Sequence, residues 1–120
     1  MATMTVVVVN EPGGLENIRI EERDIPQPGP GQILVKVGYC GCNWADTQMR
    51  EGIYPHKTDY PLILGLEIAG EVIDVGPNVS HPKRGQRVTT LVEGGGYAQF
   101  CVADAGLATI VPEGLSLASA

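Results

Sequence analysis

The sequence LEIAGEVIDV occupies residues 66–75 and is followed at once by Gly76-Pro77-Asn78. Its β-branched and apolar residues are typical of a strand, and the triplet after it ends that strand. Similar runs lie on both sides of it, at residues 4–9, 17–21, 33–39, 87–92, 97–102 and 107–111. Several short strands with turn signals between them predict a mainly β domain, either a barrel or a sandwich.

The apolar residues in the run at 33–39 alternate along the chain. Ile33, Val35, Val37 and Tyr39 fall on one face of the expected strand, and Lys36 falls on the other. Successive side chains of a strand point to opposite faces of the sheet. The pattern therefore predicts one buried face and one exposed face for this strand.

One segment has helical character. Asn43 can cap a helix whose third residue is Asp46, and Gly52 can end it. Within this helix, Asp46 and Arg50 are spaced to form an i,i+4 ion pair. A second helix is predicted to begin at Ser116, a few residues before the chain stops, and so abrupt an end is expected of a truncated chain.

Length, charge and cysteine content exclude several classes of protein. The chain has 120 residues, enough for one domain. Its net charge of −6 and its scattered basic residues argue against nucleic acid as a partner. No apolar run approaches the ~20 residues that a membrane span needs, and no signal peptide is recognisable. Three cysteines form no disulfide framework and indicate a reducing compartment, so we predict a cytoplasmic protein.

Short motifs follow one another along nearly the whole chain. They are NEPGG (10–14), PGPGQILVKV (28–37), GCNWADT (41–47), GLEIAGEV (65–72), GQRV (85–88), GYA (96–98) and VPEG (111–114). In this order they resemble the catalytic domain of the medium-chain dehydrogenase/reductases, whose fold is similar to that of the co-chaperonin GroES. The resemblance implies that residues 1–120 form a GroES-like, partly open β-barrel with one or two short helices. It also implies that the Rossmann domain of the intact enzyme is absent from this chain.

Two positions depart from the zinc-dependent members of that family. Their metal-binding cysteine falls where this chain has Asn43, and their metal-binding histidine falls on Leu66. Leucine cannot ligate zinc, and asparagine is a poor substitute for a thiolate. The resemblance therefore implies the zinc-free, zeta-crystallin-like branch of quinone oxidoreductases, with no metal.

The same resemblance assigns roles to particular side chains. Asn43 and Tyr54 become candidate catalytic residues, because an amide and a phenol can donate hydrogen bonds to an oxygen that gains negative charge during hydride transfer. The candidates for the substrate and cofactor cleft are Asp46, Thr47, Gln48 and Glu67.

Each of these roles has a structural alternative. Asn43 can serve only as a helix cap, and Tyr54 can be an ordinary loop aromatic. For Asp46 we favour a structural role, in contact with the helix N-terminus and Arg50. Glu67 is expected to bind a nearby arginine or amide and not to act as an acid or base.

The two cysteines of the segment Cys40-Gly41-Cys42 could bind a metal or form a redox pair. Their spacing is not that of a redox pair, and only two histidines occur elsewhere to complete a ligand set. Small buried thiols are common where a strand leads into a helix, and we favour that interpretation.

No glycine cluster in the sequence fits a dinucleotide-binding turn. Gly94-Gly95-Gly96 precedes a strand, whereas a phosphate-binding turn leads from a strand into a helix. The resemblance implies that NADPH is the hydride donor and that the absent domain holds most of it.

The leading hypothesis is the substrate-binding domain of an NADPH-dependent quinone oxidoreductase that transfers hydride to a small quinone without zinc. The intact enzyme is expected to be a homo-oligomer. One alternative is an enoyl or alkenal reductase of the same family, acting on an activated C=C bond. A non-enzymatic GroES-like binding module is an alternative of another class. The isolated chain is predicted to be inactive and to associate through unpaired sheet edges.

Overall fold

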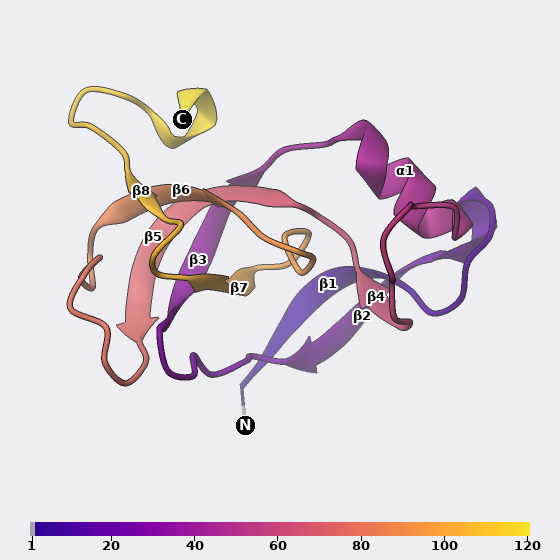
Figure 1. Cartoon of the computed structure of the whole chain (residues 1–120), viewed down its shortest axis with the longest axis horizontal. Coiled ribbons are helices and arrows are strands. Elements are labelled where there is room, and N and C mark those ends of the chain that lie inside the picture. The colour runs from indigo at the N-terminus through magenta and orange to yellow at the C-terminus, as the bar shows by residue number, and fades with distance from the viewer. Residues whose placement is uncertain (1) are drawn as a thin grey trace.

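The computed structural model describes residues 2–120 as a mainly β protein with one α-helix, which confirms the predicted fold class (Figure 1). The elements are β1 (Thr3–Val9), η1 (Leu15–Asn17), β2 (Ile18–Asp24), β3 (Gln32–Cys40), α1 (Trp44–Glu51), β4 (Leu62–Ile63), β5 (Glu67–Val75), β6 (Arg87–Leu91), β7 (Phe100–Asp104), β8 (Thr109–Ile110) and η2 (Leu117–Ser119). No helix among the described residues is long and apolar enough to cross a membrane.

The strands form two antiparallel sheets. The smaller has the order β2-β1-β4 and the larger the order β7-β3-β5-β6-β8. An isolated bridge between Val6 and Ala98 joins them, while β7 and β8 remain at opposite edges of the larger sheet. The result is a barrel that is not closed, with α1 beside the three-stranded sheet (Figure 1).

The main core lies inside the curved five-stranded sheet. Ile33, Val35, Val72 and Val88 have no exposed side-chain surface, and Ile68 retains only 2%. Burying an aliphatic side chain of this size contributes about 1.5–3 kcal/mol, so this cluster dominates the stability of the barrel. These residues come from β3, β5 and β6, the three strands at the centre of the sheet.

Most expected strands are present with shifted ends. Strand β7 begins three residues later than predicted, because residues 97–99 hydrogen-bond to β1 of the other sheet. The Val7 amide donates to the Tyr97 carbonyl at 2.9 Å, and the Gln99 amide donates to Thr5 at 3.3 Å. Strand β4, which was not predicted, has only two residues and pairs with Val8 and Val9.

The prediction that one face of β3 is buried and the other is exposed is wrong at Leu34 and Tyr39. The pairing of β3 with β5 shifts register between Leu34 and Val35 and again between Val37 and Tyr39. Such irregularities rotate the following side chains relative to the sheet, and Tyr39, after the second shift, keeps 56% of its surface exposed. Leu34 is also buried, although its neighbours Ile33 and Val35 are the ones that belong to the main core.

Helix α1 has the predicted boundaries. Asn43 is its extended N-cap, and Gly52 ends it in the left-handed conformation at φ 81°. The predicted ion pair between Asp46 and Arg50 is wrong, since Arg50 binds Glu51 and the Gly13 carbonyl instead. The helix predicted at Ser116 is only the short turn η2.

Candidate functional site

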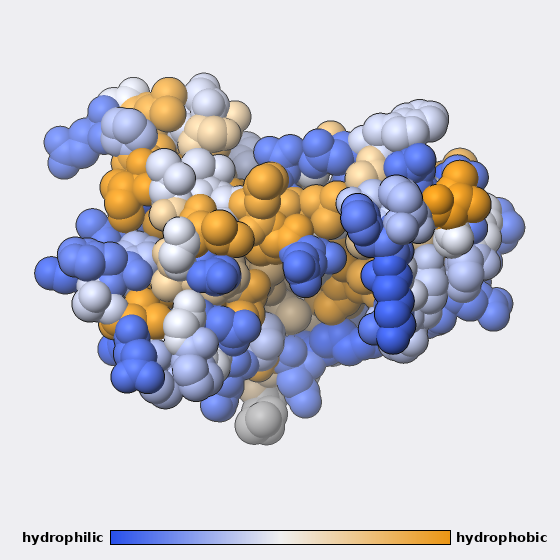
Figure 2. Space-filling model, in the orientation of Figure 1, coloured by the Kyte–Doolittle hydropathy of each residue, from blue (hydrophilic) through white to orange (hydrophobic). Residues whose placement is uncertain are grey.

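A cavity of about 650 Å³ opens between the N-terminal end of α1, the segment 54–59 and the end of β6. We call it the α1 cavity; its walls are Asn43, Ala45, Met49, Tyr54, His56, Lys57, Thr58, Asp59, Leu62, Leu66, Leu91, Val92 and Glu93. Figure 2 shows apolar side chains gathered in a hollow in the middle of the visible face, with a column of hydrophilic residues on its right side. An apolar cavity with a few polar groups is typical of a small-molecule site.

Asn43 is held at this cavity by two carboxylates. Its backbone amide donates to Asp46 Oδ2 at 2.9 Å, and its side-chain Nδ2 donates to Glu67 Oε1 at 2.8 Å. An ionised carboxylate only accepts hydrogen bonds, so the contact with Glu67 identifies which end of the amide is nitrogen. The second N–H of that nitrogen remains available to a ligand.

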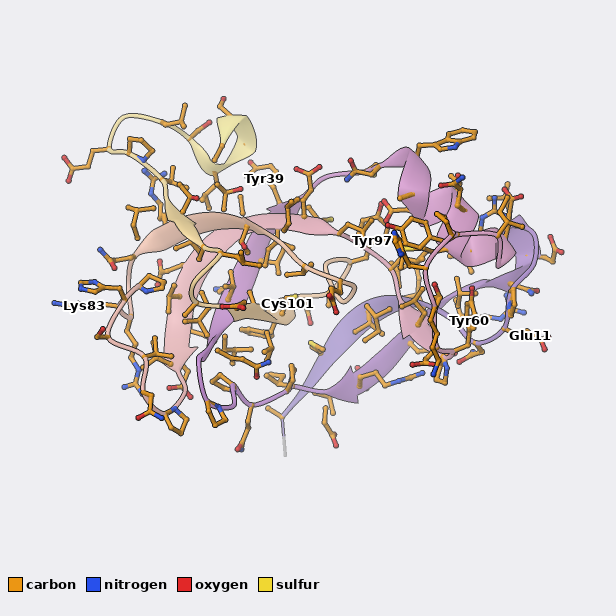
Figure 3. All side chains as sticks on the ribbon, viewed as in Figure 1. Glu11, Tyr39, Tyr60, Lys83, Tyr97 and Cys101 are labelled. Carbon is orange, nitrogen blue, oxygen red and sulfur yellow. The ribbon has the colours of Figure 1, made fainter. Side chains whose placement is uncertain are left out.

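Asp46 lies beneath Asn43 and not in the cavity wall. It is 6% exposed, and its Oδ2 also accepts a hydrogen bond of 2.6 Å from the hydroxyl of Tyr97. Burial, followed by the Asp46 carboxylate and the Cys42 thiol, raises the pKa of Tyr97 well above its ordinary value, which keeps the phenol protonated as a donor. Figure 3 shows Tyr97 against α1, although it comes from the segment before β7. The expected structural role of Asp46 thus has a partner that sequence reasoning missed.

Tyr54 reaches the α1 cavity from the segment after the helix. Its half-buried ring packs edge-on against His56, with 5.4 Å between ring centroids and 62° between planes. The base of this segment is anchored by the hydroxyl of Tyr60, which donates to the Met49 carbonyl of α1. Asn43 and Tyr54, predicted separately, therefore line one cavity.

Two other predicted residues lie outside the cavity wall. Thr47 donates its hydroxyl to the Trp44 carbonyl at 2.7 Å, within the helix. Gln48 is half-buried, and its carbonyl accepts from the Ile53 amide at 3.0 Å. Glu67 is not in the cavity wall either, and its carboxylate accepts a hydrogen bond from the Asn43 amide, a contact of the expected kind; its role in the chemistry stays a prediction.

Sequence reasoning missed two walls of the α1 cavity. One is the segment 56–59, whose only signal was its position directly after the helix and Tyr54. The other is formed by Leu91, Val92 and Glu93 at the end of β6. Leu91 pairs with Glu67 across β5 and β6, so this wall follows from strand register, which no local pattern reveals.

The predicted burial of the paired thiols is wrong, because Cys40 and Cys42 are exposed. The buried thiol is Cys101 of β7, where burial raises the pKa to about 11. Within residues 2–120 no three His, Cys, Asp or Glu side chains lie close enough to hold a metal ion together. Asn43 and Leu66 both line the α1 cavity, and an alkyl group opposite an amide does not suit zinc.

The phosphates of a dinucleotide such as NADPH do not fit the N-terminal end of α1, the one α-helix in residues 2–120. A phosphate-binding helix N-terminus offers free N–H groups to an anion. At α1 the carboxylate of Asp46 already occupies this position, and Glu67 lies beside it through Asn43. A second anion is disfavoured there.

Comparison with known proteins identifies the class of this fold and site. Residues 29–113 match the family model of the alcohol dehydrogenase GroES-like domain. The chain belongs to that family, as part of the medium-chain dehydrogenase/reductases.

Individual relatives narrow the comparison. The chain is 40% identical over 102 residues to a quinone oxidoreductase from Lama guanicoe, covering 83% of this chain and 31% of that protein. It is 39% identical over 94 residues to an NAD-dependent alcohol dehydrogenase from Sulfolobus acidocaldarius, covering 72% of this chain and 27% of that protein. Two mycobacterial structures, one of a quinone oxidoreductase and one complexed with NADPH, each match with TM-score 0.87 and 37% identity. Each match covers 94% of this chain and 35% of the other, so the chain spans about a third of these relatives.

Proposed function

We propose that this chain is the acceptor-binding domain of an NADPH-dependent quinone oxidoreductase that works without zinc. The observation that carries the proposal is the α1 cavity, which is lined by an oriented Asn43 amide, the Tyr54 side chain and several apolar side chains. Similarity to quinone oxidoreductases and to a protein complexed with NADPH supports the same activity.

The residues of this chain bind and polarise the acceptor. Met49, Leu62 and Leu66 receive a flat apolar ring, which loses its contact with water. The free N–H of Asn43 and the hydroxyl of Tyr54 are then available to the carbonyl oxygen of that ring. When hydride reaches the ring, negative charge grows on this oxygen, and one well-placed donor stabilises it by about 2.7–4 kcal/mol.

The hydride source is assigned to a domain outside this chain. NADPH supplies a hydride when bound, and residues 2–120 offer no place for its phosphates at α1. The chain alone is therefore expected to bind quinones without turning them over. We further propose a homo-oligomeric enzyme of the cytoplasm with a small-molecule substrate.

The test follows NADPH oxidation with 1,4-naphthoquinone in the longest natural protein that contains this chain. Asn43→Ala and Tyr54→Phe are each expected to lower kcat about 10²-fold, with a smaller change in KM. Ser80→Ala, a control on an exposed turn, is expected to change neither. Full activity in Asn43→Ala, or stoichiometric zinc bound at Asn43, would contradict the proposal.

Reduction of an activated C=C bond is the second candidate. A polyketide synthase from Mycobacterium tuberculosis is 39% identical over 112 residues, covering 93% of this chain and 5% of that protein. An enone places the same developing charge on oxygen, so the donors of the α1 cavity suit it equally. Turnover of enones with none of quinones would favour this candidate.

A further inference from the structure

The charges around the α1 cavity are unbalanced. Lys57 and Asp59 form an exposed ion pair at 3.9 Å and so offset each other. Glu93 lines the wall, and Glu67 and Asp46 hold Asn43. None of these three carboxylates has a cationic partner within 4.0 Å among residues 2–120.

The Glu67 carboxylate lies close to the position where a ligand would bind Asn43. Its Oε1 lies 2.8 Å from Asn43 Nδ2, the nitrogen whose other N–H is free toward a ligand. A ligand atom bonded to that N–H lies only a few ångströms from the carboxylate. At such distances, near a protein surface, two like charges repel each other, and salt weakens the repulsion.

The buried carboxylate of Asp46 adds to the negative potential at the cavity. Asp46 is 6% exposed, and its Oδ1 has no hydrogen-bond partner in the described structure. Its charge is therefore neutralised by no neighbouring cation and is screened less than that of a surface acid. Hydrogen bonding does not provide the discrimination, because an amide N–H bonds a carboxylate more strongly than a neutral carbonyl and would by itself favour the anion.

We propose that the α1 cavity selects uncharged acceptors and rejects anionic ones, with Glu67 and Glu93 as the specificity-determining residues. This inference rests on the proposed function and names the substrate class of that site. Among rings of equal shape, the neutral one binds and the carboxylated or sulfonated one is repelled. The effect of Glu67 exceeds that of Glu93, because Glu67 is half-buried and touches Asn43, whereas Glu93 is exposed.

A matched pair of ligands tests the selection. Anthraquinone-2-carboxamide and anthraquinone-2-carboxylate have nearly the same shape and differ by one charge. Both lack a free quinone carbon, so the exposed thiols of Cys40 and Cys42 cannot add to them. Binding to the 120-residue chain is followed by the fluorescence of Trp44, the one tryptophan, which is next to Asn43.

At low salt the carboxamide is expected to bind at least about tenfold more tightly than the carboxylate. This ratio falls toward one as the ionic strength rises from about 0.01 M to about 1 M and the Debye length shrinks from about 30 Å to about 3 Å. Glu67→Gln should lower the ratio by about fivefold and Glu93→Gln by about twofold. Glu113→Gln, which makes the same change in net charge at an exposed position outside the cavity wall, should leave it unchanged.

The outcomes separate this inference from the proposed function. Equal binding of both ligands, or equal ratios in Glu67→Gln and Glu113→Gln, overturns the selection and leaves quinone binding in place. Binding of neither ligand overturns both proposals. Glu93→Gln leaves the contact between Glu67 and Asn43 intact. A lower ratio of carboxamide to carboxylate affinity in this variant therefore supports the inference even if Glu67→Gln disturbs the site.

Discussion

The centre of the five-stranded sheet and the N-terminal end of α1 are built by different forces. In the sheet, Val35, Val72 and Val88 are completely buried and their strands are paired on both sides. At α1, Asn43 is exposed and is held by two single hydrogen bonds, one from its backbone amide to Asp46 and one from its side chain to Glu67. Packing therefore determines the barrel, while a few polar contacts determine the site.

This difference explains where the protein can tolerate change. A buried aliphatic residue touches many neighbours, so its loss is costly whatever the replacement. A hydrogen bond contributes only about 0.5–1.5 kcal/mol, and its loss is costly mainly when a buried partner is left without a bond. Substitutions in the two regions should therefore differ in both size and kind.

The largest effect is expected from Gly70→Ala at the centre of β5. A Cβ at this position would collide with the Lys36 carbonyl oxygen and lie 2.7 Å from Val35 Cγ1. Because a backbone atom of the neighbouring strand cannot move aside, we expect a loss of about 3–4 kcal/mol or failure to fold. Urea denaturation measures it. Gly106→Ala meets only the flexible Asp104 side chain, at 3.2 Å, and should cost less than about 1 kcal/mol; equal losses would contradict the prediction.

The next effect concerns the buried contact beneath the site. Asp46→Ala removes the acceptor for both the Asn43 amide and the Tyr97 hydroxyl, and should lower the free energy of unfolding by about 2–3 kcal/mol. Tyr97→Phe should cost about 1–2 kcal/mol. The double variant should lose clearly less stability than the sum of the two single losses, because both substitutions break the same hydrogen bond. Additive losses would show that Asp46 and Tyr97 act independently.

A smaller effect is expected in alkaline solution from the buried thiol of the barrel. Burial raises the pKa of Cys101 from 9.0 to about 11. The unfolded protein therefore releases this proton first, so the contribution to stability is present below about pH 9 and is lost as the pH rises toward 11. The expected loss is at most about 2.7 kcal/mol.

The measurement compares urea denaturation at several pH values in the native protein and in Cys101→Ala, under reducing conditions. The native protein should lose more stability than the variant between pH 9 and 11. Cys42→Ala serves as the control, because that thiol is exposed. Equal pH slopes in all three proteins would refute the assignment to Cys101.

The smallest effect on stability is expected from Glu67→Gln at the cavity. The amide oxygen of glutamine can still accept the hydrogen bond from Asn43, and the side chain is only half-buried. We expect a change within about 0.5 kcal/mol, measured by the same denaturation. A loss as large as that of Asp46→Ala would place Glu67 among the structural residues and remove the contrast between barrel and site.

Local sequence signals predicted the elements of this fold well. The run ending at Val75 and the caps at Asn43 and Gly52 are found where they were expected, since each depends on a few neighbouring residues. The ends were less predictable. Strand β7 begins at Phe100 because the residues before it pair with the other sheet, and Tyr39 turns outward at a change of register.

Partners far apart in the chain were not predictable in the same way. Tyr97 meets Asp46 across 51 positions, and Glu67 meets Asn43 across 24. Helical spacing suggested Arg50 for Asp46, but Asp46 binds Tyr97, and Arg50 binds the Gly13 carbonyl. These contacts depend on strand register and on how α1 docks, which are cooperative properties of the whole barrel.

Residue identity alone thus decided the β class, the helix ends and the absence of zinc-ligating side chains at Asn43 and Leu66, because propensity, capping and ligand chemistry reside in single residues and their neighbours. Only the folded barrel decided that Asn43 and Tyr54 share a cavity, that Glu67 orients the amide, and that Cys101 is the buried thiol. Burial and distance are set when strands pair, and no residue carries that information before they do.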